Sequence, residues 1–477
     1  DPRKMVTYLS QEGLLGLLHG GADLNEFWRR WACVEPHHRV FSAAAAQQLR
    51  LSRTIPFLSH GDEGRTKKKK GILLWTMRGC VGEGSRMFRE RADAELQRLS
   101  MGLNMNDSLT SRFLHIAIPK RVYETNSSKV WDSLSEHIAQ AYLDLETNGV
   151  VCSGERWHLV CLGLTGDNPF LAKVGHLERN YARGPKRGGG ASPVGVCWLC
   201  QAGCQGFPYE DVGKNPGWLS TCSVQDPWRS TPPFLRALGI QERGELMFRP
   251  DIWHNWHGGV AKHFVSCSMA MFIKAMPGPM GVDRKILLID QAYTEWSKTS
   301  KERLHHGRIT KDLFGLHEVV PVGSWTKFAD SRVLLLFMEH LLRCCGLHTA
   351  TTTTDRILEA CAAANSCFSI LYSSGFWLTP GAACLAGQYG LRCNCLYAIL
   401  AKTALDQGWP LFPMIPKIHY VHHAWVELVS RSRSLQWVPS PLGFSVQLDE
   451  EPWQSLINPK PFFEGIRSPT CVFLVQV

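Results

Sequence analysis

The chain has 477 residues, 44% of them hydrophobic and 20% charged, which is ordinary globular usage, excludes wholesale disorder and predicts two or three modules. Lysine plus arginine exceed aspartate plus glutamate by 52 to 42, with clusters at 67–70 and 179–187, and this excess favours an anionic partner, although a solvated basic face is the commoner origin of one lysine run. The 17 cysteines lack the dense spacing of a secreted disulfide scaffold, and no stretch approaches the roughly 20 apolar residues of a membrane helix, so we expect a soluble protein in a reducing compartment.

The first 50 residues mix polar and apolar positions and predict a helical lead-in. The pattern changes at Arg53. It then predicts two strands, 54–59 and 71–77, joined by a turn at 60–64 and a lysine-rich tip, and a third strand over 112–118.

The next elements complete the first part of the predicted core, 51–175. Apolar residues every three or four positions predict a helix over 127–145. The apolar run 157–164 predicts a buried central strand that ends in Thr165-Gly166-Asp167. The order is therefore strand, strand, strand, helix, strand, which predicts an α/β fold with a mixed sheet of the ribonuclease-H kind.

The rest of the chain changes character twice. Residues 176–265 are rich in glycine, proline, cysteine and tryptophan and predict an irregular insertion. Residues 266–430 predict a helical insertion, clearest at 334–342, 357–371 and 382–400. For 431–477 we expect only short strands and turns, in a divergent return to the core.

Two aspartates follow predicted strands. Asp62 comes after the first strand and Asp167 after the fourth, and in a ribonuclease-H-like sheet these two strands are neighbours. Two carboxylates that converge there can hold two Mg²⁺ or Mn²⁺ ions for phosphodiester chemistry. The simpler alternatives are that Asp62 belongs to a plain hairpin turn and that Asp167 caps the next helix, with Pro169 near its first position.

A zinc site is the second candidate. Cys197 and Cys200 form a CxxC turn inside the insertion, and two thiolates at this spacing can bind one Zn²⁺ ion. His254 and His257, three residues apart after Asp251, are the predicted second pair. The alternatives are buried thiols and core histidines.

A histidine-rich segment, Pro416 to His423, has helix-like spacing. It either lines the site, binds a phosphate or packs at an interdomain surface, and we favour packing.

Taken in order, these motifs resemble a known family. Asp62 in a turn, Gly166-Asp167-x-Pro-Phe, Cys197-x-x-Cys200 and Asp251-x-x-His254 are similar to the catalytic region of eukaryotic DDE DNA transposases of the CACTA and Plavaka type. The likeness covers roughly residues 50–450 and is specific from 160 to 265.

The resemblance implies that Asp62 and Asp167 are the first two catalytic acids. The third should follow the insertion, where Glu450 fits the order best and Glu339 and Glu359 are the fallbacks. It also implies DNA contacts by the basic residues of the hairpin tip and the insertion. These residues are Lys67, Lys68, Lys69, Lys70, Arg183, Lys186 and Arg187.

Two functions are therefore expected. The first is a DDE-type nuclease and strand transferase that acts on transposon ends in the nucleus with two Mg²⁺ or Mn²⁺ ions, with or without retained activity. The second is a non-catalytic, zinc-stabilised DNA-binding or assembly module derived from such an enzyme. Neither has a membrane partner, and a homo-oligomer is left open.

Overall fold

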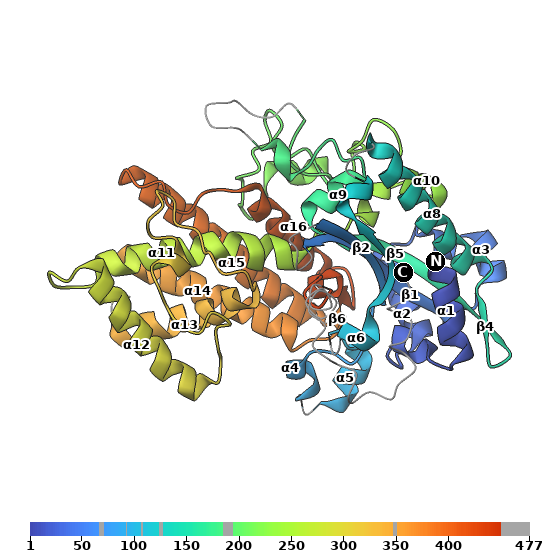
Figure 1. Ribbon diagram of the computed structural model, residues 1–477, viewed down its shortest axis with the longest axis horizontal. Coiled ribbons are helices and arrows are strands. Elements are labelled where there is room, and N and C mark those ends of the chain that lie inside the picture. The colour runs from blue at the N-terminus through green and yellow to red at the C-terminus, as the bar shows by residue number, and fades with distance from the viewer. Residues whose placement is uncertain are drawn as a thin grey trace.

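The computed structural model describes residues 1–65, 71–91, 93–105, 108–123, 127–184, 194–346 and 351–449. In this part of the chain a mixed sheet lies among helices, and a group of long helices lies beside it (Figure 1). The expected α/β class and the mainly helical second half are confirmed.

The sheet has five strands in the order β3-β2-β1-β5-β4. Their bounds are Thr54–Arg65 (β1), Gly71–Gly79 (β2), Phe113–Pro119 (β3), Val150–Cys152 (β4) and Glu155–Gly166 (β5). β2 is antiparallel to both β1 and β3, whereas β5 is parallel to β1. β4 and β5 form an antiparallel hairpin. The central pair, β1 and β5, therefore joins segments that are far apart in the sequence.

The predicted strands are present, but one expectation is wrong. Residues 60–64 do not form a turn, because β1 continues to Arg65 and pairs with β2 as far as Arg65 and Gly71. Local glycine and aspartate content favoured the turn, whereas the partner strand satisfies the backbone groups of these residues in the sheet. Asp62 consequently has strand geometry and shares a face of β1 with His60. The hairpin tip lies outside the described residues.

The helices vary widely in length. The α-helices are α1 (Pro2–Gln11), α2 (Leu24–Val34), α3 (Ala43–Gln48), α4 (Arg86–Arg89), α5 (Ala94–Ser100), α6 (Ser108–Ser111), α7 (Lys120–Tyr123), α8 (Ser127–Thr147), α9 (Asn168–Val174), α10 (Pro233–Ala237), α11 (Ala261–Ala275), α12 (Val282–Ser300), α13 (Ala329–Cys345), α14 (Thr352–Tyr372), α15 (Pro380–Asp406) and α16 (Pro416–Arg431). The 3₁₀ turns are η1 (Leu15–Leu18), η2 (Arg39–Phe41), η3 (Leu51–Arg53), η4 (Tyr181–Arg183), η5 (Gly217–Thr221), η6 (Gly244–Met247), η8 (Asp312–Phe314) and η10 (Pro441–Phe444). A π-helix, η7 (Trp253–Val260), leads directly into α11.

Helix α8 covers one face of the sheet. The rings of Phe57 and Tyr142 meet edge to face with centroids 4.8 Å apart. The Tyr142 hydroxyl lies 2.9 Å from Ser59 Oγ, which also accepts a hydrogen bond from Trp75 Nε1 at 2.7 Å. Phe234 of α10 stacks on Trp75 at 6.3 Å. These contacts bury the polar atoms of the sheet together with their partners, as a packed core requires.

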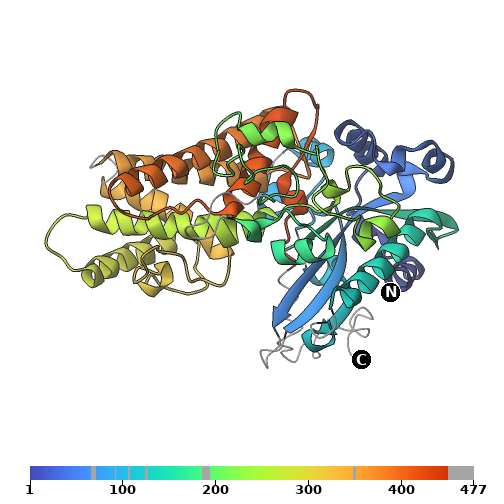
Figure 2. The same cartoon turned by 90° about the horizontal axis from the view of Figure 1, so that it is seen from above.

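The long helices form a second layer of structure. α14 packs against both α13 and α15, and α15 packs against α16. Figures 1 and 2 show α11–α15 gathered to one side of the sheet, with α16 between this group and the strands. No helix among the described residues combines the length and the apolar character needed to cross a bilayer.

After α16 the chain comes back to the sheet. β7 (Val438–Pro439) pairs with β6 (Trp377–Leu378), and η10 follows. Asp449 then forms ion pairs with Arg78 of β2 at 3.1 Å and with Arg112, just before β3, at 3.4 Å. All three side chains are almost fully buried, so this cluster fastens residues 438–449 to the face of the sheet opposite α8.

Candidate metal centre and carboxylate site

The turn at 197–200 is held rigidly by its surroundings. Trp198 is fully buried, and its indole Nε1 donates to the Phe248 carbonyl oxygen at 2.9 Å. The Arg179 guanidinium group donates to the carbonyl oxygen of Cys197 at 3.1 Å. Backbone N–H groups also point at both sulfur atoms, at 3.3 Å for Cys197 and 3.4 Å for Cys200. Donors placed this way stabilise thiolates.

Helix α16 brings two imidazoles to these thiols. His419 and His423 are four residues apart and therefore lie on one face of the helix. Cys200 Sγ lies 3.3 Å from His419 Nε2 and 3.4 Å from His423 Nε2, and Cys197 Sγ lies 3.6 Å from His423 Nε2. All four ligand atoms fall within 4.8 Å of one another.

These distances fit one tetrahedral ion. With zinc bonds of about 2.3 Å to sulfur and 2.0–2.1 Å to nitrogen, neighbouring S and N ligands of a tetrahedron are about 3.5 Å apart. The three observed separations lie on either side of this value. Two cysteines and two histidines are a set typical of closed structural sites. The buried group can therefore hold a metal ion such as zinc.

The charges of the cluster suit a cation. Burial by itself disfavours a thiolate, but the Cys200 thiol and the imidazoles of His419 and His423 hold the pKa of Cys197 well below its usual value. The thiolate is the form that binds zinc. A low pKa at Cys197 reduces the cost of deprotonating this ligand at neutral pH.

The neighbouring histidine serves a different purpose. His422 Nε2 lies 2.9 Å from the Gly213 carbonyl oxygen, and Nδ1 lies 3.3 Å from Asn394 Nδ2. The expected packing role therefore fits His422. For His419 and His423 the structure corrects this expectation. The H-x-x-x-H spacing, together with an incomplete CxxC site, was the signal in the sequence that could have identified them.

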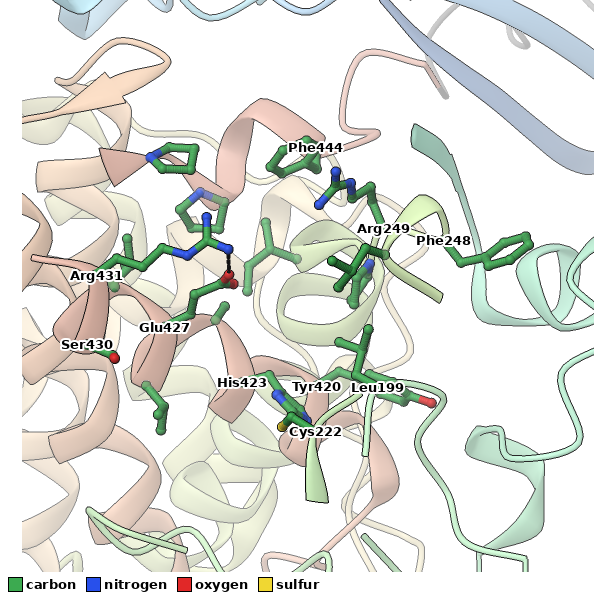
Figure 3. Close-up of a pocket in the computed structure, with 18 of the residues that line it drawn as sticks. Leu199, Cys222, Phe248, Arg249, Tyr420, His423, Glu427, Ser430, Arg431 and Phe444 are labelled. Atoms are coloured by element: carbon green, nitrogen blue, oxygen red, sulfur yellow. Dashed lines mark ion pairs between the residues drawn. The ribbon is translucent and has the colours of Figure 1, made fainter. Parts of the chain in front are cut away.

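A cavity of about 390 Å³ opens beside the metal centre. Figure 3 shows His423, Cys222 and Leu199 together on its wall, with Arg249 and Phe444 across from them. A Glu427–Arg431 ion pair lies on the same helix as His423. Of the four candidate ligands, His423 lines this cavity.

The structure does not place His254 and His257 with the two cysteines. His254 Nδ1 lies 2.7 Å from Asp251 Oδ2. His257 is buried between the rings of Trp253 and Phe368, at 4.8 Å from each. The two histidines lie on the π-helix η7, whose i→i+5 bonding does not give the side-chain spacing of the expected α-helical turn. The predicted zinc pair is corrected accordingly.

The buried environment of His257 predicts a pH dependence. Burial lowers the pKa of His257 to about 3, against 6.5 in an unfolded chain. A lowered imidazole pKa means that the folded protein keeps its full stability above pH 6.5 and loses it as the pH falls towards 3. We expect His257→Phe to reduce the pH dependence of the unfolding free energy over this range by about 1.4 kcal/mol per pH unit.

Chemical denaturation at a series of pH values measures this effect. His317→Phe provides the control, because the His317 side chain is exposed. Identical slopes for His257→Phe and wild type would show that His257 is protonated in the folded state.

Asp62 and Asp167 lie at matching points of neighbouring strands. In the parallel pair β1–β5, Gly61 is the partner of Gly166, and each aspartate is the next residue. Adjacent strands are about 4.8 Å apart. Both aspartates are half-buried, whereas His60 and Thr165, one step before the glycines, are buried.

Gly61 and Gly166 allow the two strands and the Phe170 ring to come this close together. A Cβ on Gly61 would lie 2.0 Å from Phe170 Cζ, and one on Gly166 would lie 2.4 Å from the Gly61 carbonyl oxygen. The Phe170 ring, in the first turn of α9, therefore packs directly over the strand pair. Asp167 Oδ1 accepts a hydrogen bond from the Phe170 backbone N–H at 2.7 Å, so the expected helix-capping role of Asp167 is confirmed.

Other acids near the site have different partners. Glu63 Oε1 lies 2.8 Å from Lys173 Nζ and Oε2 lies 3.4 Å from Lys120 Nζ. The fallback acids Glu339 and Glu359 form ion pairs with Arg343 and Arg392 within the helical group.

Several expected site residues lie outside the described part of the chain. They are Lys67, Lys68, Lys69, Lys70, Lys186, Arg187 and Glu450. Arg183 is described and is exposed at the end of η4.

Comparison with known proteins gives no family assignment. No family model, curated protein or solved structure has a significant match to this chain.

Proposed function

We propose that the chain is a transposase-derived nuclease and strand transferase of the DDE type, built on a ribonuclease-H-like sheet and acting on DNA in the nucleus. Three features of the sheet support this proposal. β1 is central, β2 pairs antiparallel with β1 and β3 pairs antiparallel with β2, and the next long strand, β5, returns parallel to β1 on its other side.

The observation that carries the proposal is the pairing of Gly61 with Gly166. It brings the backbones of Asp62 and Asp167 together, although the two residues are far apart in the sequence. Two metal ions in phosphodiester chemistry are about 3.5–4 Å apart, close to the separation of adjacent strands. Carboxylates at such a point can share Mg²⁺ or Mn²⁺, which prefer oxygen ligands. Mn²⁺ or Mg²⁺ would polarise the scissile phosphate and activate the attacking oxygen.

Replacing either aspartate tests the proposal. Asp62→Asn and Asp167→Asn should each lower Mn²⁺-dependent nicking of supercoiled DNA by at least about 100-fold, the scale of losing a group that stabilises transition-state charge. The Asp167 change is a clean test because asparagine also caps helices, and α9 should remain intact.

Asp312→Asn is the matched control, because the Asp312 side chain is 91% exposed. It should nick DNA at the wild-type rate. Calorimetric titration with Mn²⁺ gives a second reading, since both site variants should bind the ion more weakly than the control. Unchanged nicking by both site variants would refute the proposal.

A second function is favoured by the partners of Asp449. The acid next to the expected third catalytic residue is neutralised by Arg78 and Arg112. This supports a non-catalytic, zinc-stabilised DNA-binding or assembly module derived from the same kind of enzyme. Such a module binds DNA in a salt-sensitive manner and contains zinc, but it nicks no DNA with any divalent ion.

A further inference from the structure

Lys417 is a half-buried cation in the first turn of α16. Its Nζ donates to the His254 carbonyl oxygen at 3.0 Å. The stem of the side chain lies against η7, where a Cβ on Gly259 would be only 2.5 Å from Lys417 Cδ. The glycine therefore leaves the space through which Lys417 reaches this position.

The position adjoins the carboxylate site. Asn168, the residue after Asp167, donates from Nδ2 to Asn255 Oδ1 at 3.0 Å, so the start of α9 is fastened to η7 beside His254. The carboxylates of Asp167 and Asp251 are close enough to act electrostatically on the Lys417 ammonium group. Lys417 is thus close to one of the two proposed catalytic acids.

Asp251 itself is committed to holding the local backbone. Its carboxylate accepts hydrogen bonds from the backbone N–H groups of Trp253 at 2.9 Å, His254 at 2.7 Å and Val446 at 3.2 Å. It is 1% exposed. Asp251 therefore fixes the start of η7, the element that carries the His254 carbonyl bonded to Lys417. Asp167, half-buried, is the acid that solvent can reach.

The metal centre lies on the same helix. His419 is two residues after Lys417 and His423 is six residues after it. The two histidines and the cysteines of the insertion share one cluster. An ion in this cluster would fix the start of α16, and with it the backbone from which Lys417 extends.

We propose that Lys417 is a phosphate contact of the carboxylate site, where its ammonium group binds a DNA phosphodiester beside Asp167, and that the metal centre positions it through α16. This inference rests on the proposed function and names its substrate contact. A site built from carboxylates repels a phosphodiester, so a cation at its edge lowers the electrostatic cost of binding. Lysine is well suited to this because its ammonium group acts as a compact point charge.

The test uses the zinc-loaded protein and a DNA duplex in Ca²⁺, which allows binding to be followed without dependence on cleavage. Fluorescence anisotropy gives the dissociation constant at a series of salt concentrations. Lys417→Gln should weaken binding by about tenfold and reduce the slope of log K against log salt by about 0.9, the value for one duplex phosphate contact. Lys417→Arg should keep the wild-type slope.

Lys402→Gln is the matched control, because Lys402 is exposed on α15 and pairs with Asp406. It should keep the wild-type slope and affinity. Zinc content is measured for every variant and should stay at the wild-type level in Lys417→Gln.

Three results overturn the inference. A wild-type slope in Lys417→Gln removes the phosphate contact, and so does a wild-type protein that does not bind DNA. Loss of zinc from Lys417→Gln would mean that Lys417 supports the metal centre and not the reverse. The nuclease proposal can fail separately. If the wild-type protein nicks no DNA but Lys417→Gln still lowers the salt slope of DNA binding, the phosphate contact is supported and the nuclease function is not.

Discussion

Cys197→Ser is expected to weaken zinc binding by about 100-fold and to loosen the insertion from α16. Isolated Cys/His zinc peptides bind their ion with about 10–16 kcal/mol, so one of four ligands accounts for about 3 kcal/mol, or roughly two orders of magnitude in affinity. In the described residues between α9 and η7 the regular elements are the short η4, η5, α10 and η6, and a cross-link of this kind holds such a segment in shape. Competition with a zinc-binding dye and thermal unfolding measure the two effects.

The control is Cys222→Ser. Cys222 lies against Cys200, and this contact is the main cause of the lowered pKa of Cys222. Cys222 is not one of the four grouped ligands. Its replacement should leave one zinc per chain and an unchanged unfolding temperature. Because His423 lines the cavity, a chelator should remove zinc from the wild-type protein and loosen the insertion, and it should do so at a lower concentration in Cys197→Ser. A wild-type zinc affinity in Cys197→Ser would contradict the assignment of the ligands.

Asp449→Asn is expected to destabilise the contact between residues 438–449 and the sheet by about 3–5 kcal/mol. The change removes the anion and leaves Arg78 and Arg112 buried, each with only 2% of its side chain exposed. Arg78 would still donate to the Ser445 carbonyl oxygen at 2.8 Å, but this bond does not neutralise its charge. Hydrogen exchange of residues 438–449 and denaturant unfolding measure the loss.

Asp406→Asn serves as the comparison, because Asp406 is exposed and forms an i,i+4 pair with Lys402. Such pairs contribute about 0.3–0.5 kcal/mol, so this variant should be close to wild type. The wild-type protein adds a check from pH. Burial opposes the charged form of Asp449, but the two arginines hold its pKa below the usual value. The contribution of Asp449 to stability is therefore present at pH values above the ordinary aspartate pKa and is lost on acidification. Equal exchange in both variants would contradict a structural role for Asp449.

The Cys197 and Asp449 variants test two clusters that hold α16 and the segment after it in place. The metal cluster joins α16 to the insertion that follows α9, and the Asp449 cluster joins the segment after α16 to β2 and β3. Lys417 lies on α16, which the metal cluster holds, and Asp62 lies on β1, the neighbour of β2. Loosening either link should therefore reduce DNA binding even though neither cluster is proposed to contact DNA.

Much of the sheet could be predicted from local pattern alone. The apolar run before Asp167 forms β5, as predicted. The segment before that run, with apolar residues every three or four positions, forms α8. Both predictions succeed because periodicity and hydrophobicity are properties of short segments. The turn expected around Asp62 was wrong for the complementary reason. Its glycines favour a turn in isolation, but β2 and β5 on either side satisfy its backbone in the sheet.

The sequence by itself determined the α/β class, the CxxC half of the metal centre and the two aspartates that follow Gly61 and Gly166 in the paired strands. Only the tertiary structure decided that His419 and His423 complete the centre and that His254 and His257 do not. It also revealed Lys417 beside Asp167. The physical reason is that a ligand set or an ion cluster is defined by distances of a few ångströms between residues more than 200 positions apart, and such distances depend on how whole helices pack. Local composition carries no record of that packing.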